Sequence, residues 1–167
     1  MDGINAQLRE DIALYQKFES GIEGSLQGVL DNLPEGDWGR FTDDLAGARF
    51  LAFSNPETGM LATMRIKKTQ ETVLPLYTSV EEILRTQPFP PGMRIGVMNY
   101  GEVCHSLALN KNIDGIVINP AGRYFPLPSG SVVEILHLAV WKKMMLLMKA
   151  MGAGPKGGGD KPAKAYH

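Results

Sequence analysis

The sequence predicts an α/β (α+β) fold, a mixed β-sheet of about five or six strands with helices packed on it. Three features predict this fold. Residues 4–33 repeat apolar side chains at spacings of three and four, as amphipathic helices do. Between residues 49 and 131, short apolar segments alternate with helix start signals and with turns that contain proline or glycine. A long apolar helix then follows, and this order is typical of a sheet covered by helices.

The N-terminal segment is expected to form acidic helices. Its apolar stripe comprises Ile4, Leu8, Ile12, Tyr15, Phe18, Ile22, Leu26, Val29 and Leu33. The opposite face carries the acidic residues Glu10, Asp11, Glu19 and Glu23. Gly21 and Gly24 are expected to divide the stripe into two helices, because glycine weakens a helix interior. Residues 33–37 break the pattern, and residues 38–45 resume it.

The strands are expected in the middle of the chain. They cover residues 49–54, 60–67, 72–78, 93–98, 114–119 and 123–127. The first two are expected to form a hairpin, because residues 55–59 have the composition of a turn.

Three helices are expected to begin at capping boxes, in which a Ser or Asn and a Glu three residues later satisfy each other's backbone donors. The pairs are Ser79 with Glu82, Asn99 with Glu102, and Ser131 with Glu134.

The last of these helices carries more apolar side chains than one core face can use. They are Leu136, Leu138, Val140, Trp141, Met144, Met145, Leu147, Met148 and Met151. Either they close the core against the N-terminal helices, or part of this methionine-rich surface binds a partner, since flexible thioethers suit adaptable interfaces. In the second case Lys142, Lys143 and Lys149 would form a basic rim.

The chain is long enough for one domain with extensions. The expected parts are an acidic N-terminal helical segment (1–37), an α/β domain (38–137), a C-terminal helix extension (138–151) and a flexible tail rich in Gly, Pro and Lys (152–167).

Charge and composition exclude several function classes. The net charge is −1, with 11 basic and 16 acidic residues in 1–130 and 6 and 2 in 131–167. No nucleic-acid reader module is visible, so we expect no nucleic-acid partner. Charged residues interrupt the apolar stretch 132–151, so no membrane span is expected. No signal peptide is visible at the start, and we therefore expect a cytoplasmic location.

No catalytic motif, metal site or cofactor site is recognised. Cys104 is the only cysteine, and its neighbour His105 would point about 100° away from it on a helix. The three histidines lack metal-ligand spacing, and the glycine run 152–159 does not lie between a strand and a helix as a phosphate loop would. We therefore expect no enzymatic activity.

Two segments resemble a known family. Residues 74–82 (LPLYTSVEE) and 114–122 (DGIVINPAG), followed by FPLP at 125–128, resemble motifs of the SseB N-terminal domain family in order and spacing. The resemblance covers roughly residues 38–137. It implies a small bacterial cytoplasmic α/β domain that acts as an interaction module without enzymatic activity or cofactor. Some members occur near secretion and toxin–immunity systems, which implies a secretion chaperone or an immunity protein.

The leading hypothesis is a non-catalytic adaptor, chaperone or immunity-type protein that binds a bacterial protein partner. The candidate partner-binding residues are Arg123, Tyr124, Phe125, Trp141, Lys142, Met145, Glu81 and Glu82. The first three place a cation and two aromatic rings at a hairpin tip, although Phe125 could equally belong to the core. Two alternatives stay open: a small-molecule sensor or weak enzyme with a pocket near Cys104 and His105, and a structural homo-oligomer built on the last helix.

Overall fold

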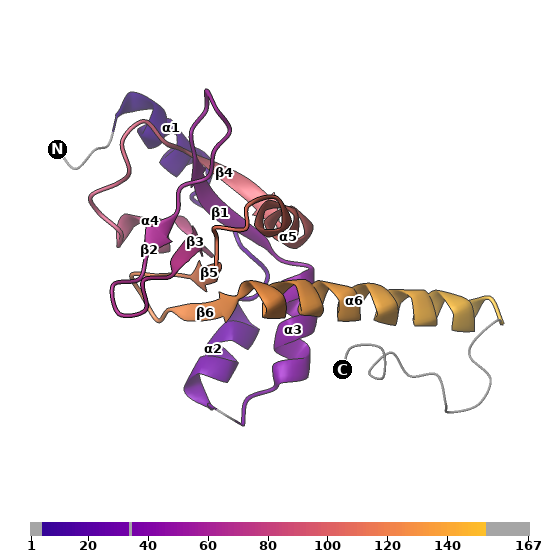
Figure 1. Cartoon of the computed structure of the whole chain (residues 1–167). Helices are drawn as coiled ribbons and strands as arrows, with labels where there is room; N and C mark the ends of the chain where they lie inside the picture. The colour runs from indigo at the N-terminus through magenta and orange to yellow at the C-terminus, as the bar shows by residue number, and fades with distance from the viewer. Residues whose placement is uncertain (1–4, 34, 153–167) are drawn as a thin grey trace.

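The computed structural model describes residues 5–33 and 35–152, and it confirms the mixed α/β architecture (Figure 1). In this part of the chain the elements are α1 (Ala6–Leu14), α2 (Glu23–Asp31), α3 (Trp38–Ala46), β1 (Arg49–Ser54), β2 (Met64–Arg65), β3 (Thr72–Leu76), α4 (Val80–Leu84), β4 (Arg94–Asn99), α5 (Tyr100–Leu109), β5 (Gly115–Ile118), β6 (Phe125–Pro128) and α6 (Ser129–Ala150). Helices α1 and α2 are separate, as predicted, and Gly21 lies between them with a φ of +99° that favours glycine. Gly24, the other glycine expected at this break, is instead the second residue of α2. Residues 153–167 of the expected tail lie outside the described residues.

The strands form two sheets that meet at β1 and β3. Strands β1 and β4 pair antiparallel along their whole length, beginning with Arg49 opposite Asn99. The second sheet has the order β2-β3-β5-β6, in which β3 and β5 are parallel and the other pairs are antiparallel. A bridge between Leu51 and Tyr77 joins β1 to the end of β3 through two backbone hydrogen bonds of 2.9 Å.

The hairpin expected for residues 49–54 and 60–67 is wrong for most of its length. Strand β1 pairs with β4, and residues 60–67 contribute only the two-residue strand β2, which pairs with β3. In the described structure, the expected hairpin is reduced to one bridge, between Ser54 and Leu61. A six-residue ladder with β4 satisfies more buried backbone donors and acceptors than this short segment could.

Strand β1 is buried on both faces and separates two cores. Phe50 and Ala52 face the larger core, which includes side chains of α2, α3, α5 and the start of α6. Leu51 and Phe53 face a smaller core formed with α1, α4 and β4. The division follows from strand geometry, because alternate side chains point to opposite faces.

Two of the expected helix starts are found where the sequence places them. Asn99 and Glu102 form a complete capping box at the start of α5. At the start of α4 only half of the expected capping box forms. The Ser79 side chain accepts a hydrogen bond of 3.3 Å from the backbone N–H of Glu82, but the Glu82 carboxylate does not accept one from the Ser79 backbone.

The capping box expected at Ser131 is wrong. Helix α6 begins two residues earlier, at Ser129, and Pro128 is its N-cap without a side-chain hydrogen bond. The backbone N–H of Ser129 donates to the Asp114 carbonyl at 2.9 Å, and its hydroxyl donates to the Ile113 carbonyl at 3.1 Å. These bonds to the segment before β5 fix the start of the helix.

One ion pair holds α1 against β4. The Asp11 carboxylate accepts hydrogen bonds of 2.6 and 2.7 Å from the Arg94 guanidinium and one of 3.0 Å from the Ile95 backbone N–H. The side chain of Asp11 is only 6% exposed. Its hydrogen bonds with Arg94 hold the pKa of the Asp11 carboxyl below its usual range, although burial opposes the shift.

Helix α6 extends well beyond the rest of the described structure (Figure 1). Val132, near its start, is its only fully buried residue. We call residues 140–151 the α6 arm. Its exposed large apolar residues are Val140, Met144, Leu146, Leu147, Met148 and Met151. Of the helices described, none is long and apolar enough to cross a membrane.

Candidate functional site

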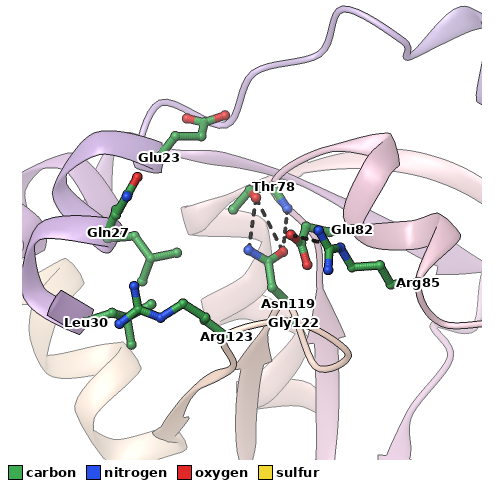
Figure 2. A pocket seen from close by; sticks show the side chains of 10 residues that line it. Glu23, Gln27, Leu30, Thr78, Glu82, Arg85, Asn119, Gly122 and Arg123 are labelled. Atoms are coloured by element: carbon green, nitrogen blue, oxygen red, sulfur yellow. Dashed lines mark hydrogen bonds and ion pairs between the residues drawn. The ribbon is translucent and has the colours of Figure 1, made fainter.

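A cavity of about 310 Å³ lies at the carboxyl ends of the parallel strands β3 and β5 (Figure 2). Ligands of α/β proteins commonly bind at such strand ends. Helix α2 forms one wall through Leu26, Gln27 and Leu30, and α4 contributes Glu82 and Arg85. We call this space the strand-end cavity.

Two buried polar residues bind each other at the base of the strand-end cavity. Thr78 follows β3, and Asn119 follows β5. The Asn119 side-chain oxygen accepts a hydrogen bond of 3.0 Å from the Thr78 backbone N–H, and its amide donates to the Thr78 hydroxyl at 3.0 Å. Asn119 has a φ of +55°, a left-handed conformation that asparagine tolerates better than most residues. This pair ties together the two strand ends and the turn that leads to Arg123.

Glu82 presents a carboxylate oxygen without a partner. Its Oε1 atom is buried, and no residue in the described ranges donates a hydrogen bond to it. Its other oxygen, Oε2, lies 3.7 Å from the Arg85 Nε atom. The carboxylate lies so close to Gly122 that a Cβ at that position would overlap with it. Gly122 therefore leaves the space that Glu82 occupies over the turn.

The other charged residues around the strand-end cavity already have partners. Both carboxylate oxygens of Glu23 accept backbone hydrogen bonds of 2.7 Å, from Ser20 and Gly21. The Arg123 guanidinium is paired with Asp31 at the end of α2. Among the described residues that line this cavity, Glu82 is therefore the one with a buried, unpaired carboxylate oxygen, which lies against Gly122.

The predicted partner-binding residues lie in two separate regions. Glu82 and Arg123 both line the strand-end cavity, where Figure 2 shows them on opposite sides of Asn119. Glu81, one residue away, is largely exposed and pairs with the Arg85 guanidinium at 3.3 Å. Tyr124 is also exposed. That these residues bind a partner stays a prediction.

Phe125 belongs to the core. Its ring lies 5.1 Å from that of Phe41 and 6.0 Å from that of Trp38, measured between centroids. It is buried against α3, so of the two interpretations left open for Phe125, the structure supports core packing.

The remaining predicted residues lie on the α6 arm. Trp141 and Met145 are half-buried, and Lys142 is exposed and forms a hydrogen-bonded ion pair of 2.9 Å with Asp43 of α3. A second cavity, of about 350 Å³, lies between α3 and α6 and includes Leu136 and Leu146 in its lining. This surface is apolar with a charged edge.

The alternative hypothesis of a small-molecule pocket near Cys104 and His105 would need an accessible thiol, and the Cys104 thiol is buried. Cys104 is 6% exposed, and its Sγ atom lies 3.7 Å from the Val132 carbonyl oxygen, between α5 and α6. His105 is exposed on another side of α5. Neither residue lines the two cavities described above. The hydrophobic packing of α5 explains the burial, because Val103, Cys104 and Leu107 all face the larger core.

We expect Cys104 to react slowly with thiol reagents in the folded protein. Burial raises the pKa of its thiol to about 11, so very little thiolate is present at pH 8. Labelling with a maleimide or an aromatic disulfide should be at least about 100-fold slower than for a small free thiol. The protein unfolded in guanidinium is the control and should react at an ordinary rate. Rapid labelling of the folded protein would contradict this burial.

No protein-family model matches the chain, and no curated protein matches it. The resemblance to the SseB family therefore stays a prediction. In residues 5–33 and 35–152, no group of three or more His, Cys, Asp and Glu side chains is placed to hold a metal ion.

Proposed function

We propose that the chain is a non-catalytic protein-binding protein that holds an acidic partner against the α6 arm. The exposure of apolar side chains on this arm is the observation that supports the proposal. Met144 is 54% exposed, Leu147 63% and Met151 78%. Together with Val140 they follow one another at spacings of four, three and four, which places them along one side of a helix. Large contiguous apolar surfaces of this kind are typical of interaction sites.

The charge of the arm favours an acidic partner. Residues 135–152 contain three lysines, Lys142, Lys143 and Lys149, and no acidic residue. Lys142 is paired with Asp43 of α3, a helix that packs against α6. A partner helix or surface with apolar residues flanked by Asp and Glu would match both the stripe and the lysines. The methionines suit such contacts, because their unbranched side chains adapt to different surfaces.

The finer assignment rests on the resemblance to the SseB family. It favours a cytoplasmic adaptor, a secretion chaperone or an immunity protein of a toxin system. A homo-oligomer through the same helix is the competing possibility, and the experiment below separates the two.

The test is a pull-down from the native host lysate with three versions of the full-length chain. The wild type is compared with the double variant Met144→Glu/Leu147→Glu, which places negative charge in the apolar stripe. The matched control is Leu109→Glu, a similarly exposed leucine at the end of α5. Circular dichroism and thermal unfolding establish that each variant is folded.

We expect one stoichiometric acidic protein to be captured by the wild type and by Leu109→Glu. The purified pair should associate more slowly at high salt. The double variant should bind it at least about 100-fold more weakly, the size of effect expected when two central contacts are lost. Equal capture by all three versions, or no capture, would overturn the proposal. A concentration-dependent dimer by light scattering that the double variant abolishes would replace it with the homo-oligomer.

A further inference from the structure

We propose that a third cavity, beside β2, binds a small uncharged aromatic molecule. This cavity has a volume of about 380 Å³ and lies between β2 and the segment that follows α4 (Figure 1). It shares no lining residue with the strand-end cavity or with the cavity between α3 and α6, so it is separate from the α6 arm. We call it the proline-lined cavity, because its lining includes Pro75, Pro88, Pro90 and Pro120.

Hydrogen bonds hold the walls of the proline-lined cavity in place. The Ala62 backbone N–H donates to the Phe53 carbonyl at 2.9 Å, which fixes one wall beside β1. The Thr86 backbone N–H and hydroxyl both donate to the Ile83 carbonyl, at 2.9 and 2.6 Å, which fixes the wall after α4. The proline rings restrict the backbone further. A site whose walls are already ordered loses little free energy to ordering when a ligand binds.

Aromatic rings form the floor of the cavity. The Phe53 ring lies 5.8 Å from the Tyr77 ring and 6.0 Å from the Phe89 ring, measured between centroids. These three residues are at most 4% exposed, so a ligand reaches them only after it has passed the mouth. Met64, which is 38% exposed, and the exposed Pro88 lie at the mouth. Aromatic rings and thioethers both make favourable contacts with a further aromatic ring, so a planar aromatic ligand suits this lining.

The polar groups of the lining favour a ligand without charge. None of the described residues that line the cavity is charged. A charged ligand would therefore lose its hydration without gaining an ion pair. Thr63, Tyr77 and Thr86 contribute hydroxyl groups, which can both donate and accept hydrogen bonds and so match a phenol O–H or an indole N–H. The volume of about 380 Å³ is in the lower part of the range for small-molecule sites and is sufficient for one or two rings.

The test is nuclear magnetic resonance of the full-length chain, isotope-labelled at its methionine methyl groups. Phenol and indole are added up to about 5 mM, since micromolar to millimolar affinity is expected for ligands of this size. A bound ring should shift the methyl signal of Met64, which lines the cavity and whose signal is missing from the spectrum of Met64→Glu. The signals of Met60 and of the exposed arm methionines Met144, Met148 and Met151 should not move.

The decisive variant is Met64→Glu, which brings a charge to the mouth of the cavity. Its matched control is Met60→Glu, a methionine that is 67% exposed and does not line the cavity. Met64→Glu should bind phenol and indole at least about 10-fold more weakly, while Met60→Glu should bind them as the wild type does. Thermal unfolding establishes that both variants are folded.

Three further compounds test the class of ligand. Benzoate and benzylammonium add a negative or a positive charge to the ring, and cyclohexanol replaces the ring of phenol with a saturated one. Each should bind the wild type at least about 10-fold more weakly than phenol does.

Four results would overturn the proposal. They are a Met64 signal that neither phenol nor indole shifts, arm methionines that shift as much as Met64, unchanged binding by Met64→Glu, and binding of a charged compound or cyclohexanol as tight as that of phenol. Partner capture by the α6 arm is measured separately, so either proposal can fail without the other.

Discussion

The Gly115→Ala variant is expected to lose about 3 kcal/mol of its free energy of unfolding, the upper part of the range for an overpacked site. Gly115 is the first residue of β5 and pairs with Pro128 of β6. A Cβ at this position would overlap with the carbonyl oxygen of Leu127 and lie 3.0 Å from the Pro128 Cα atom. Both obstacles are backbone atoms, so a side-chain rotation cannot relieve the overlap. For a chain of this length, the melting temperature should fall by about 6 to 12 °C.

Gly96→Ala is the matched control for this substitution. Gly96 also lies in a strand, β4, but a Cβ there would meet no atom within 4 Å. Its melting temperature should stay the same or rise slightly, because alanine restricts the unfolded chain. Calorimetry of both variants measures the difference. Equal melting temperatures for the two would show that β6 can move away from β5, contrary to the packing described here.

The Asp11→Asn variant is expected to lose about 2 kcal/mol of its free energy of unfolding at pH 7, because hydrogen bonds to charged groups contribute about this much. Asparagine keeps the size of the side chain and can still accept from the Ile95 N–H. It removes the charge that binds both Arg94 nitrogens, at 2.6 and 2.7 Å. Helix α1 would then lose its main polar contact with β4.

The loss should depend on pH in a direction fixed by the pKa of Asp11. The Arg94 hydrogen bonds lower this pKa in the folded protein. The carboxylate therefore stabilises the fold fully above the unfolded-state pKa, about 3.9, and this stabilisation disappears as the pH falls through the lower folded-state value. Urea unfolding of wild type and variant should differ most at neutral pH and converge in acid.

Asp31→Asn provides the comparison for a surface pair. Asp31 binds Arg123, but both side chains are about half exposed. Its removal should cost under about 1 kcal/mol. A loss at Asp11 no larger than that at Asp31 would show that burial does not strengthen the Arg94 pair.

Local signals in the sequence were sufficient for most elements of the fold. The capping box at Asn99 and Glu102 and the apolar segment before Asn119 each depend on a few neighbouring residues, and both are found in the structure. The same local signals did not predict which strand pairs with β1. The turn at residues 55–59 does form, with Gly59 N–H donating to the Asn55 carbonyl at 2.8 Å. A turn brings two segments close together. Strand β1 nevertheless pairs with β4, because the six residue pairs between them form more backbone hydrogen bonds than the segment after the turn could.

The strand-end cavity could be predicted only in pieces. The sequence indicates Glu82 and Arg123 only as separate candidate partner-binding residues, because it does not tell which strands are neighbours. Sequence reasoning misses Thr78 and Asn119, although each is a polar residue at the end of a segment expected to form a strand. Once β3 and β5 are known to be parallel, this position alone would bring the two side chains together.

Because β1 pairs with β4, strand β1 leaves the ribosome before its partner strand has been synthesised. Residues 49–54 are synthesised about 45 positions before residues 94–99, their only long partner in the described sheet. At about 5 to 20 residues per second, this leaves an interval of about 2 to 9 seconds. During this interval β1, which is apolar on both faces, lacks its partner strand β4. Unpaired strands of this kind readily form hydrogen bonds with other chains. Translation speed between residues 54 and 99 should therefore influence the yield of folded protein.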